Sequence, residues 1–294
     1  VSFLTIFEMK AFVVTLTLLV SSTVQIKAKE LQKIEDEWIL MPDGREYHDS
    51  CVYRHETSLF EDVKDLKPCA YKPRQSNLGY YSDWSVYAKA VELKDHFSFL
   101  TSKWIVPEAP KSTGPAGMSS VYYFDGLEDG SGTHGNASFI LQPVLQYGKS
   151  GCVIDPLLWH QWHLSAYLVD GDGRAHCGPR LHVETGETVM GTIFQDQNGW
   201  TVEAVRLKTN ETSTYTTKTL NDKVVDAAYM TLEGMIIYSC DAFPSGGGIT
   251  FTDISATSGK GSNVDLKWQS EVRHDECNQK VDLLSNGDVR LEYS

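Results

Sequence analysis

Between about residue 80 and the end of the chain, apolar and polar residues alternate in short runs that predict β-strands. The runs are rich in β-branched and aromatic residues, and turns rich in glycine and asparagine separate them. The predicted strands are 121–124, 140–147, 163–169, 181–183, 189–194, 200–207, 214–220, 227–233, 235–240, 249–254 and 289–293. The predicted turns are 170–173, 198–199, 245–248, 258–261 and 286–287. Many short strands without long helices between them predict an all-β fold, an antiparallel β-sandwich.

The chain before residue 80 has a different pattern and predicts an N-terminal extension over 29–79, ahead of a sandwich domain over 80–294. Residues 29–50 are charged, and their apolar side chains are spaced for a short amphipathic helix. The helix positions are Leu31, Ile34, Trp38 and Ile39. Residues 51–79 combine cysteines and prolines with little alternation, which favours a small disulfide-linked module or linker. The extension is either structural or a removable propeptide.

The first 28 residues are expected to be a translated leader followed by a secretory signal peptide. Lys10 precedes the apolar run 11–20, and small residues follow it, as in the charged and hydrophobic regions of a signal peptide. After this segment no apolar run is long enough to span a bilayer. The sequence therefore predicts a secreted protein without a membrane span.

The formal net charge of −13 and the scattered lysines and arginines disfavour one class of partner. Nucleic-acid binding depends on neutralising phosphates with a basic surface, and the chain has no basic stripe. We expect no nucleic-acid partner and a monomer.

Six cysteines, an even number in a chain expected to be secreted, predict disulfides. Sequence neighbours suggest Cys51–Cys69, Cys152–Cys177 and Cys240–Cys277, which is one of fifteen possible pairings. Asn136-Ala137-Ser138 and Asn210-Glu211-Thr212 are acceptor sequences for N-glycosylation in turn-like surroundings. Asn136 and Asn210 are therefore candidate glycosylation sites.

Two predicted strands end in side chains suited to hydrolysis. Alternation along 227–233 directs Glu233 away from the apolar face of its strand. Gln142 ends the apolar run 139–141, and Pro143 after it cannot donate to a strand ladder, which predicts a bulge or strand end there. A carboxylate can activate water while a neutral amide donates to the developing oxyanion.

The local sequence leaves other interpretations of both residues open. Gln142 could be an amide on the sheet surface that bonds a neighbour, and Glu233 a solvated carboxylate at a strand end. Gln146 lies two pleats further along the same strand face and is the local rival of Gln142.

Seven short segments follow one another in a fixed order from residue 82. They are Ser82-Asp83-Trp84, Trp104-Ile105-Val106-Pro107, Phe124-Asp125-Gly126-Leu127-Glu128-Asp129, Ile140-Leu141-Gln142, Trp159-His160-Gln161-Trp162, Gly186-Glu187-Thr188-Val189 and Ala228 through Glu233. Their order resembles that of the fungal glutamic peptidases, the eqolisins, which are secreted acid proteases built on a β-sandwich. The resemblance covers about residues 80–294. It implies a sandwich of the concanavalin-like or jelly-roll type and a catalytic pair at Gln142 and Glu233.

The chain departs from the eqolisin pattern around this pair. An aspartate of the family aligns with Glu128, a supporting glutamate aligns with Gln161, and a tryptophan aligns with Phe124. The resemblance assigns these three residues, with Trp84 and Trp159, to substrate binding. Altered activity or specificity is therefore expected.

Other catalytic chemistries have little support in the sequence. His160 and His163 are three residues apart, so a strand directs their rings to opposite faces and cannot present both to one metal. A serine triad lacks the Gly-x-Ser-x-Gly turn. We expect neither a metal nor a cofactor.

The leading hypothesis is a secreted endopeptidase that hydrolyses polypeptides in acid with a glutamine and glutamate pair. Aromatic side chains such as Trp84 and Trp159 could instead stack on sugar rings or pack in a core. The second hypothesis is therefore a catalytically weak or inactive sandwich that binds a glycan or peptide. A third is a secreted structural or defence protein without a small ligand.

Overall fold

The computed structural model describes residues 38–41, 45–55, 60–61, 69, 71–73, 81–92, 95–130, 139–170, 174–221 and 223–294. The chain divides into two compact units, Val1–Ile39 and Leu40–Ser294. The expected leader (1–28), most of the expected helix and the candidate glycosylation site Asn136 lie outside the described residues.

The described residues form strands and short 3-10 helices, and no α-helix. The N-terminal strands are β1 (Trp38–Leu40), β2 (Arg45–His48), β3 (Val52–Arg54), β4 (Phe60–Glu61) and β5 (Tyr71–Pro73). The next are β6 (Tyr81–Val91), β7 (Phe97–Ile105), β8 (Ser120–Glu128), β9 (Phe139–Tyr147), β10 (Trp162–Asp170), β11 (Ala175–Cys177) and β12 (Leu181–Val183). The last are β13 (Thr188–Asp196), β14 (Gly199–Arg206), β15 (Glu211–Thr217), β16 (Ala227–Ile237), β17 (Gly248–Ser258), β18 (Gln269–Val272), β19 (Lys280–Leu283) and β20 (Val289–Glu292).

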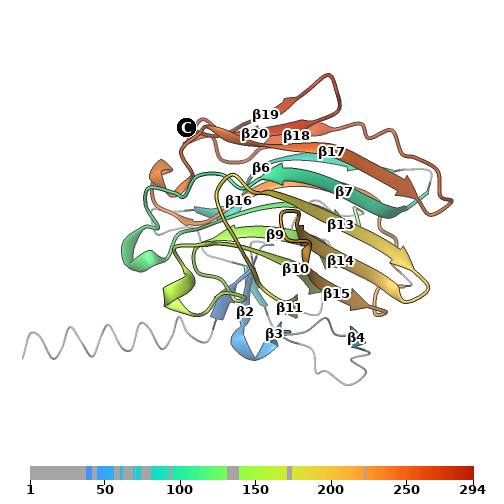
Figure 1. The fold of residues 1–294 in the computed structure, drawn as a ribbon, viewed down its shortest axis with the longest axis horizontal. Coiled ribbons are helices and arrows are strands. Elements are labelled where there is room, and N and C mark those ends of the chain that lie inside the picture. The colour runs from blue at the N-terminus through green and yellow to red at the C-terminus, as the bar shows by residue number, and fades with distance from the viewer. Residues whose placement is uncertain are drawn as a thin grey trace, which may run out of the picture. The chain divides into compact units, whose positions relative to one another are not determined.

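Two sheets make up a sandwich in the unit Leu40–Ser294 (Figure 1). One sheet has the order β18-β6-β16-β8-β9-β10-β11-β3, with β12 also paired to β10. The other has the order β19-β20-β17-β7-β13-β14-β15-β4. All pairs are antiparallel except β3 with β11 and β4 with β15. The predicted all-β sandwich is therefore confirmed.

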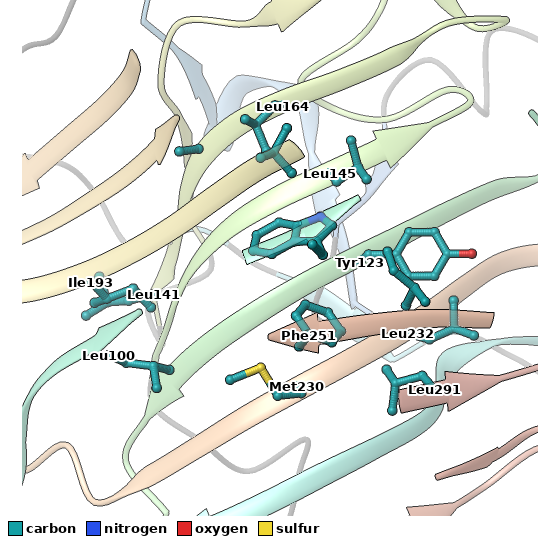
Figure 2. Packing of buried hydrophobic residues seen from close by; sticks show 14 of the residues in the cluster. Leu100, Tyr123, Leu141, Leu145, Leu164, Ile193, Met230, Leu232, Phe251 and Leu291 are labelled. Carbon is teal, nitrogen blue, oxygen red and sulfur yellow. The ribbon is translucent and has the colours of Figure 1, made fainter. Parts of the chain in front are cut away.

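The core lies between the two sheets and is almost entirely apolar (Figure 2). Leu141 and Leu145 of β9, with Met230 and Leu232 of β16, are fully buried from one sheet, and Ile193 is fully buried from the other. Because strand side chains alternate faces, Gln142, Gln146 and Glu233 lie on the opposite, outer face of the nine-stranded sheet.

The helix expected within 29–50 is wrong where the structure describes it. Trp38–Leu40 and Arg45–His48 are strands, and β2 pairs with β5. The three consecutive apolar residues of β1 fit a strand as well as a helical turn, so spacing alone misassigned them. Strands β3 and β4, from the expected extension, pair with the edges of the two sandwich sheets.

One strand, β16, covers 227–237 where the sequence predicts two strands, 227–233 and 235–240. Against β8 the register of β16 is continuous from Ala227 to Met235, so Gly234 does not end the strand. Against β6 the register shifts between Leu232 and Glu233, which marks a bulge. Pro143 likewise lies inside β9, and the expected strand end after Gln142 is absent. The strand predicted at 214–220 starts earlier and ends at Thr217.

All three disulfides suggested by neighbouring cysteines are present: Cys51–Cys69, Cys152–Cys177 and Cys240–Cys277. Three disulfides are consistent with an extracellular protein. Within the described part of the chain no helix is long and apolar enough to cross a membrane.

A hydrogen bond through the core connects the two sheets. Asp125 on β8 is fully buried, and the Ser102 hydroxyl on β7 donates to its Oδ2 at 2.8 Å. A β-carbon on Gly191 of β13 would overlap the Asp125 carboxyl group and the Pro143 ring. The approach of the two sheets here therefore requires a glycine. Burial raises the pKa of Asp125 to about 7, and the Ser102 hydrogen bond only partly offsets this.

Strand β3 is held to β11 by a buried pair of histidines. His55 Nε2 and His176 Nδ1 lie 3.5 Å apart, and the His55 amide donates to the Cys177 carbonyl at 2.8 Å. Tyr53 and Tyr215 pack on the His176 ring at centroid distances of 4.9 and 5.1 Å. Burial lowers the pKa of His176 to about 3, and positive charge on His55 and Arg174 lowers it further.

We predict that Asp125→Asn makes the free energy of unfolding less dependent on pH. The folded pKa lies above the unfolded value, so the folded state binds more protons and loses stability as pH rises from about 4 to about 7. A titrating group contributes at most about 1.4 kcal/mol per pH unit in such a window. Urea unfolding from pH 4 to 8 measures this, with the exposed Asp253→Asn as control. Equal slopes for parent and Asp125→Asn would contradict the prediction.

We predict the opposite slope for His176. Its folded pKa lies below the unfolded value, so stability is complete above about pH 6.5 and falls as pH drops toward 3. His176→Phe keeps an aromatic ring and removes the titration, so stability should fall less in acid than in the parent. Hydrogen exchange of the His55 amide reports the docking of β3 directly. The exposed His160→Phe serves as control, and an unchanged acid slope in His176→Phe would refute the assignment.

Candidate functional site

Three neighbouring strands of the nine-stranded sheet bring a carboxyl group and an amide into one row. Glu233 on β16 pairs with Tyr122 on β8, and Tyr122 pairs with Gln146 on β9. Neighbouring strands lie about 4.8 Å apart, so the Cα atoms of Glu233 and Gln146 are separated by about 10 Å. The side chain of Tyr122, on the strand between them, separates the two groups.

Gln142 lies on the same face but in a different row. The pairs Phe124 with Val144 and Leu127 with Leu141 place Gln142 opposite Gly126, which pairs with Tyr229 of β16. Tyr229 precedes Glu233 by four residues, or about 13 Å along a strand. The structure therefore brings Gln146, and not Gln142, into the row of Glu233. By these registers, Gln142 lies four residues along the sheet from the row of Glu233.

Hydrogen bonds fix the orientation of the Gln146 amide. The hydroxyls of Tyr167 and Ser150 donate to Oε1 at 2.7 and 2.8 Å, and Nε2 donates to the Gly148 carbonyl at 2.8 Å. A carbonyl can only accept, so the Gly148 bond assigns the nitrogen side of the amide. One of the two N–H bonds of Nε2 is used in this way.

Tyr122 lies between Glu233 and Gln146 and is close to the neighbours of both. Its hydroxyl donates to the Lys149 carbonyl at 3.3 Å. Burial raises the pKa of Tyr122 well above its usual value, and the nearby Tyr167 and Glu233 raise it further. The phenol of Tyr122 is therefore neutral. It lies close to the Glu233 carboxyl group and to Tyr167, whose hydroxyl helps to orient the Gln146 amide.

A bulge in β6 places an aromatic wall beside Glu233. Leu232 pairs with Val86 and Glu233 with Trp84, so Ser85 is the extra residue on β6. The bulge changes the alternation and directs Trp84 to the outer face. There its ring contacts Tyr87, Phe124 and Tyr229 at centroid distances of 5.3, 5.6 and 5.0 Å. Of the substrate-binding residues expected from the resemblance, Trp84 and Phe124 thus lie together on the site face.

The other expected residues lie at two separate places. Glu128 ends β8, is buried, and raises the pKa of Tyr229 in addition to the larger effect of burial. Trp159 and Gln161 lie in the turn before β10, where Trp159 Nε1 donates to the Val153 carbonyl at 3.0 Å. Gln161 Nε2 donates to the Leu157 carbonyl at 3.4 Å.

Sequence reasoning did not find Tyr122, Tyr167 or Ser150. None belongs to a short motif. Strand pairing brings Tyr122 and β10, which carries Tyr167, close to Gln146, and the turn after β9 brings Ser150. Alternation already placed Gln146 on the site face as a rival. Within the part of the chain that the structure describes, no group of three His, Cys, Asp or Glu side chains could hold a metal ion.

Burial limits access to the Glu233 and Gln146 side chains in this structure. Glu233 is 0% exposed and Gln146 1% exposed, although both lie on the outer face of the sandwich. A substrate therefore reaches them only when a covering part of the chain moves or is removed.

Comparison with known proteins supports the fold class and identifies particular structures that share it. The sandwich is similar to solved structures of glutamic peptidases. SCP-B, a member of the eqolisin family of peptidases solved with the tripeptide Ala-Ile-His, matches with a TM-score of 0.50 and 13% identity. Scytalido-glutamic peptidase with a peptide-based transition state analog matches with a TM-score of 0.51 and 14% identity. Its structure with a transition state analog inhibitor gives 0.52 and 15%.

Each match covers 73% of this chain and 100% of the other. At these identities the likeness shows the fold. No protein-family profile matches the chain, and no curated protein matches it.

Proposed function

We propose that the protein is a secreted glutamic endopeptidase whose carboxyl group is Glu233 and whose amide is Gln146. The observation that carries the proposal is the row in which the two residues flank Tyr122 on one sheet face. The fold shared with glutamic peptidases supports it. Gln142, which the sequence resemblance favours for the amide, lies too far from Glu233 to act on the same atom.

In the proposed reaction Glu233 takes a proton from water, and the resulting hydroxide attacks the carbonyl carbon of the peptide bond. The second N–H of Gln146 donates to the carbonyl oxygen as it becomes negative. Glu233 then gives its proton to the leaving nitrogen, and the carbon–nitrogen bond breaks to yield a carboxylic acid and an amine. A glutamate that accepts and returns a proton works best near its own pKa, so activity is expected in acid.

The burial of the pair implies that the full chain is a resting form. Strand β3, from the expected extension 29–79, pairs with the sheet that carries the site, so we propose that removal of the extension activates the enzyme. Exposed Asn210, in the turn between β14 and β15, remains a candidate glycan acceptor. Glycosylation there fits the proposed secretion.

The binding-module hypothesis has one supporting feature, the aromatic wall of Trp84, Tyr87, Phe124 and Tyr229. Flat aromatic rings suit both sugar rings and peptide side chains. The orientation of Gln146 by three hydrogen bonds favours catalysis, since simple binding does not require a fixed amide.

We predict that Glu233→Gln and Gln146→Ala abolish cleavage of a denatured protein while Gln142→Ala leaves it within a few-fold of the parent. General acid–base catalysis contributes about 10²–10⁴-fold, and one oxyanion donor about 10²–10³-fold. The assay is digestion from pH 2 to 7 after incubation in acid, with N-terminal sequencing of the active species. Chelators and thiol- or serine-directed reagents should have no effect.

Gln142→Ala is the matched control, because it removes the same amide from the same strand face. Loss of activity in that variant, with Gln146→Ala active, would restore the pairing implied by the sequence resemblance. Absence of cleavage by the parent, with retention on a glycan or peptide column, would favour the binding module.

A further inference from the structure

Positive charge collects beside Gln146, although the chain as a whole carries a net charge of −13. Lys149 follows Gln146 by three residues, just after β9. His163 on β10 pairs with Gln146 on one side and with His182 of β12 on the other. Arg180 immediately precedes β12 and acts electrostatically on both His163 and Tyr167. We call Lys149, His163, Arg180 and His182 the cationic cluster.

The two permanent charges of the cationic cluster have no carboxylate partner in the part of the chain that the structure describes. Among the described residues, neither Lys149 nor Arg180 takes part in an ion pair. By contrast, Lys208 pairs with Glu184 and Glu187, which follow β12 closely in the sequence. Lys149 Nζ instead lies over the Trp159 ring, 5.5 Å from its centroid. The end of the cluster at β12 is accessible, because Arg180 and His182 are exposed.

A buried polar atom lies inside the cluster. His163 is 2% exposed, and its Nε2 is 3.1 Å from the Leu158 carbonyl, so Nε2 carries the proton that this carbonyl accepts. Nδ1 is then the acceptor nitrogen, and no group in the described chain bonds it. The His163 ring lies 5.9 Å from the His182 ring.

We propose that the cationic cluster is a subsite for a carboxylate side chain of the peptide substrate, two or three residues from the cleaved bond on the Gln146 side. The proposal rests on the proposed function for the position of the bond. Glu233, Tyr122, Gln146 and His163 follow one another across the sheet at about 4.8 Å per strand. His163 is therefore about 10 Å from the centre of the pair, which an extended peptide covers in about three residues.

A bound anion would also reduce the repulsion between the positive charges of the cationic cluster. Burial, together with repulsion by Arg180 and His182, lowers the pKa of His163 to about 4. A bound carboxylate offsets that repulsion, and a protonated His163 would donate to it from Nδ1. Binding of an acidic peptide should therefore raise the pKa of His163, which NMR titration of the ring measures.

The test uses the chain carrying Glu233→Gln, which prevents turnover, after incubation in acid with a trace of the parent protein to remove the extension. The ligands are fluorescein-labelled alanine octapeptides at pH 6. Each peptide carries one glutamate, and its twin carries glutamine at the same position. Fluorescence anisotropy should show at least one glutamate peptide binding about five-fold more tightly than its twin, the order expected for a partly exposed ion pair. Arg180→Gln and Lys149→Gln should each remove most of the difference. Lys267→Gln, which removes an exposed charge between β17 and β18, should not.

Equal affinity for the twins at every position overturns the subsite, as does an equal loss in Lys267→Gln. The two proposals fail separately. Cleavage by the parent with no preference for glutamate removes the subsite and leaves the peptidase. A preference that depends on Arg180, without cleavage at any pH, supports the subsite and counts against hydrolysis.

Discussion

The register of three strands, β9, β8 and β16, is the constraint on which the candidate site depends. A strand side chain has only two directions, so a polar residue on the outer face can occupy any of several rows. The pairing of neighbouring strands decides which row each residue occupies. With Glu233 opposite Tyr122, and Tyr122 opposite Gln146, the carboxyl group and the amide share one. A displacement by two residues would keep every apolar side chain in the core and still separate the pair.

The surroundings of this row depend on local departures from regular structure. The bulge at Ser85 brings Trp84 onto the same face as Tyr87, although their spacing of three would separate them on a regular strand. Gly148 supplies the carbonyl that orients the Gln146 amide, and the turn beyond it holds Ser150. The chemistry thus depends on a few irregular residues beside long regular strands.

Much of the fold follows from the sequence, because alternation and turn residues are local signals. The hairpin at Asn198-Gly199 and the outward direction of Glu233 are examples. Register is not local, and Gln142 and Gln146 are equivalent under a period of two. Both also follow a leucine, so the short motif Ile-Leu-Gln cannot by itself distinguish the row of Gln142 from the row of Gln146. Trp38–Leu40 shows the other limit, since three apolar residues fit a helix or a strand.

The disulfide Cys152–Cys177 has a consequence for where the proposed enzyme can work. It links the segment after β9, which contains two of the three hydrogen-bond partners of Gln146, to strand β11 two strands away. In a reducing compartment this disulfide is reduced, and the Gln146 amide loses the fixed hydrogen-bond partners that orient it. The disulfide would then restrict proteolysis to the oxidising space outside the cell. The proteins of the cell that makes the enzyme would not be cleaved.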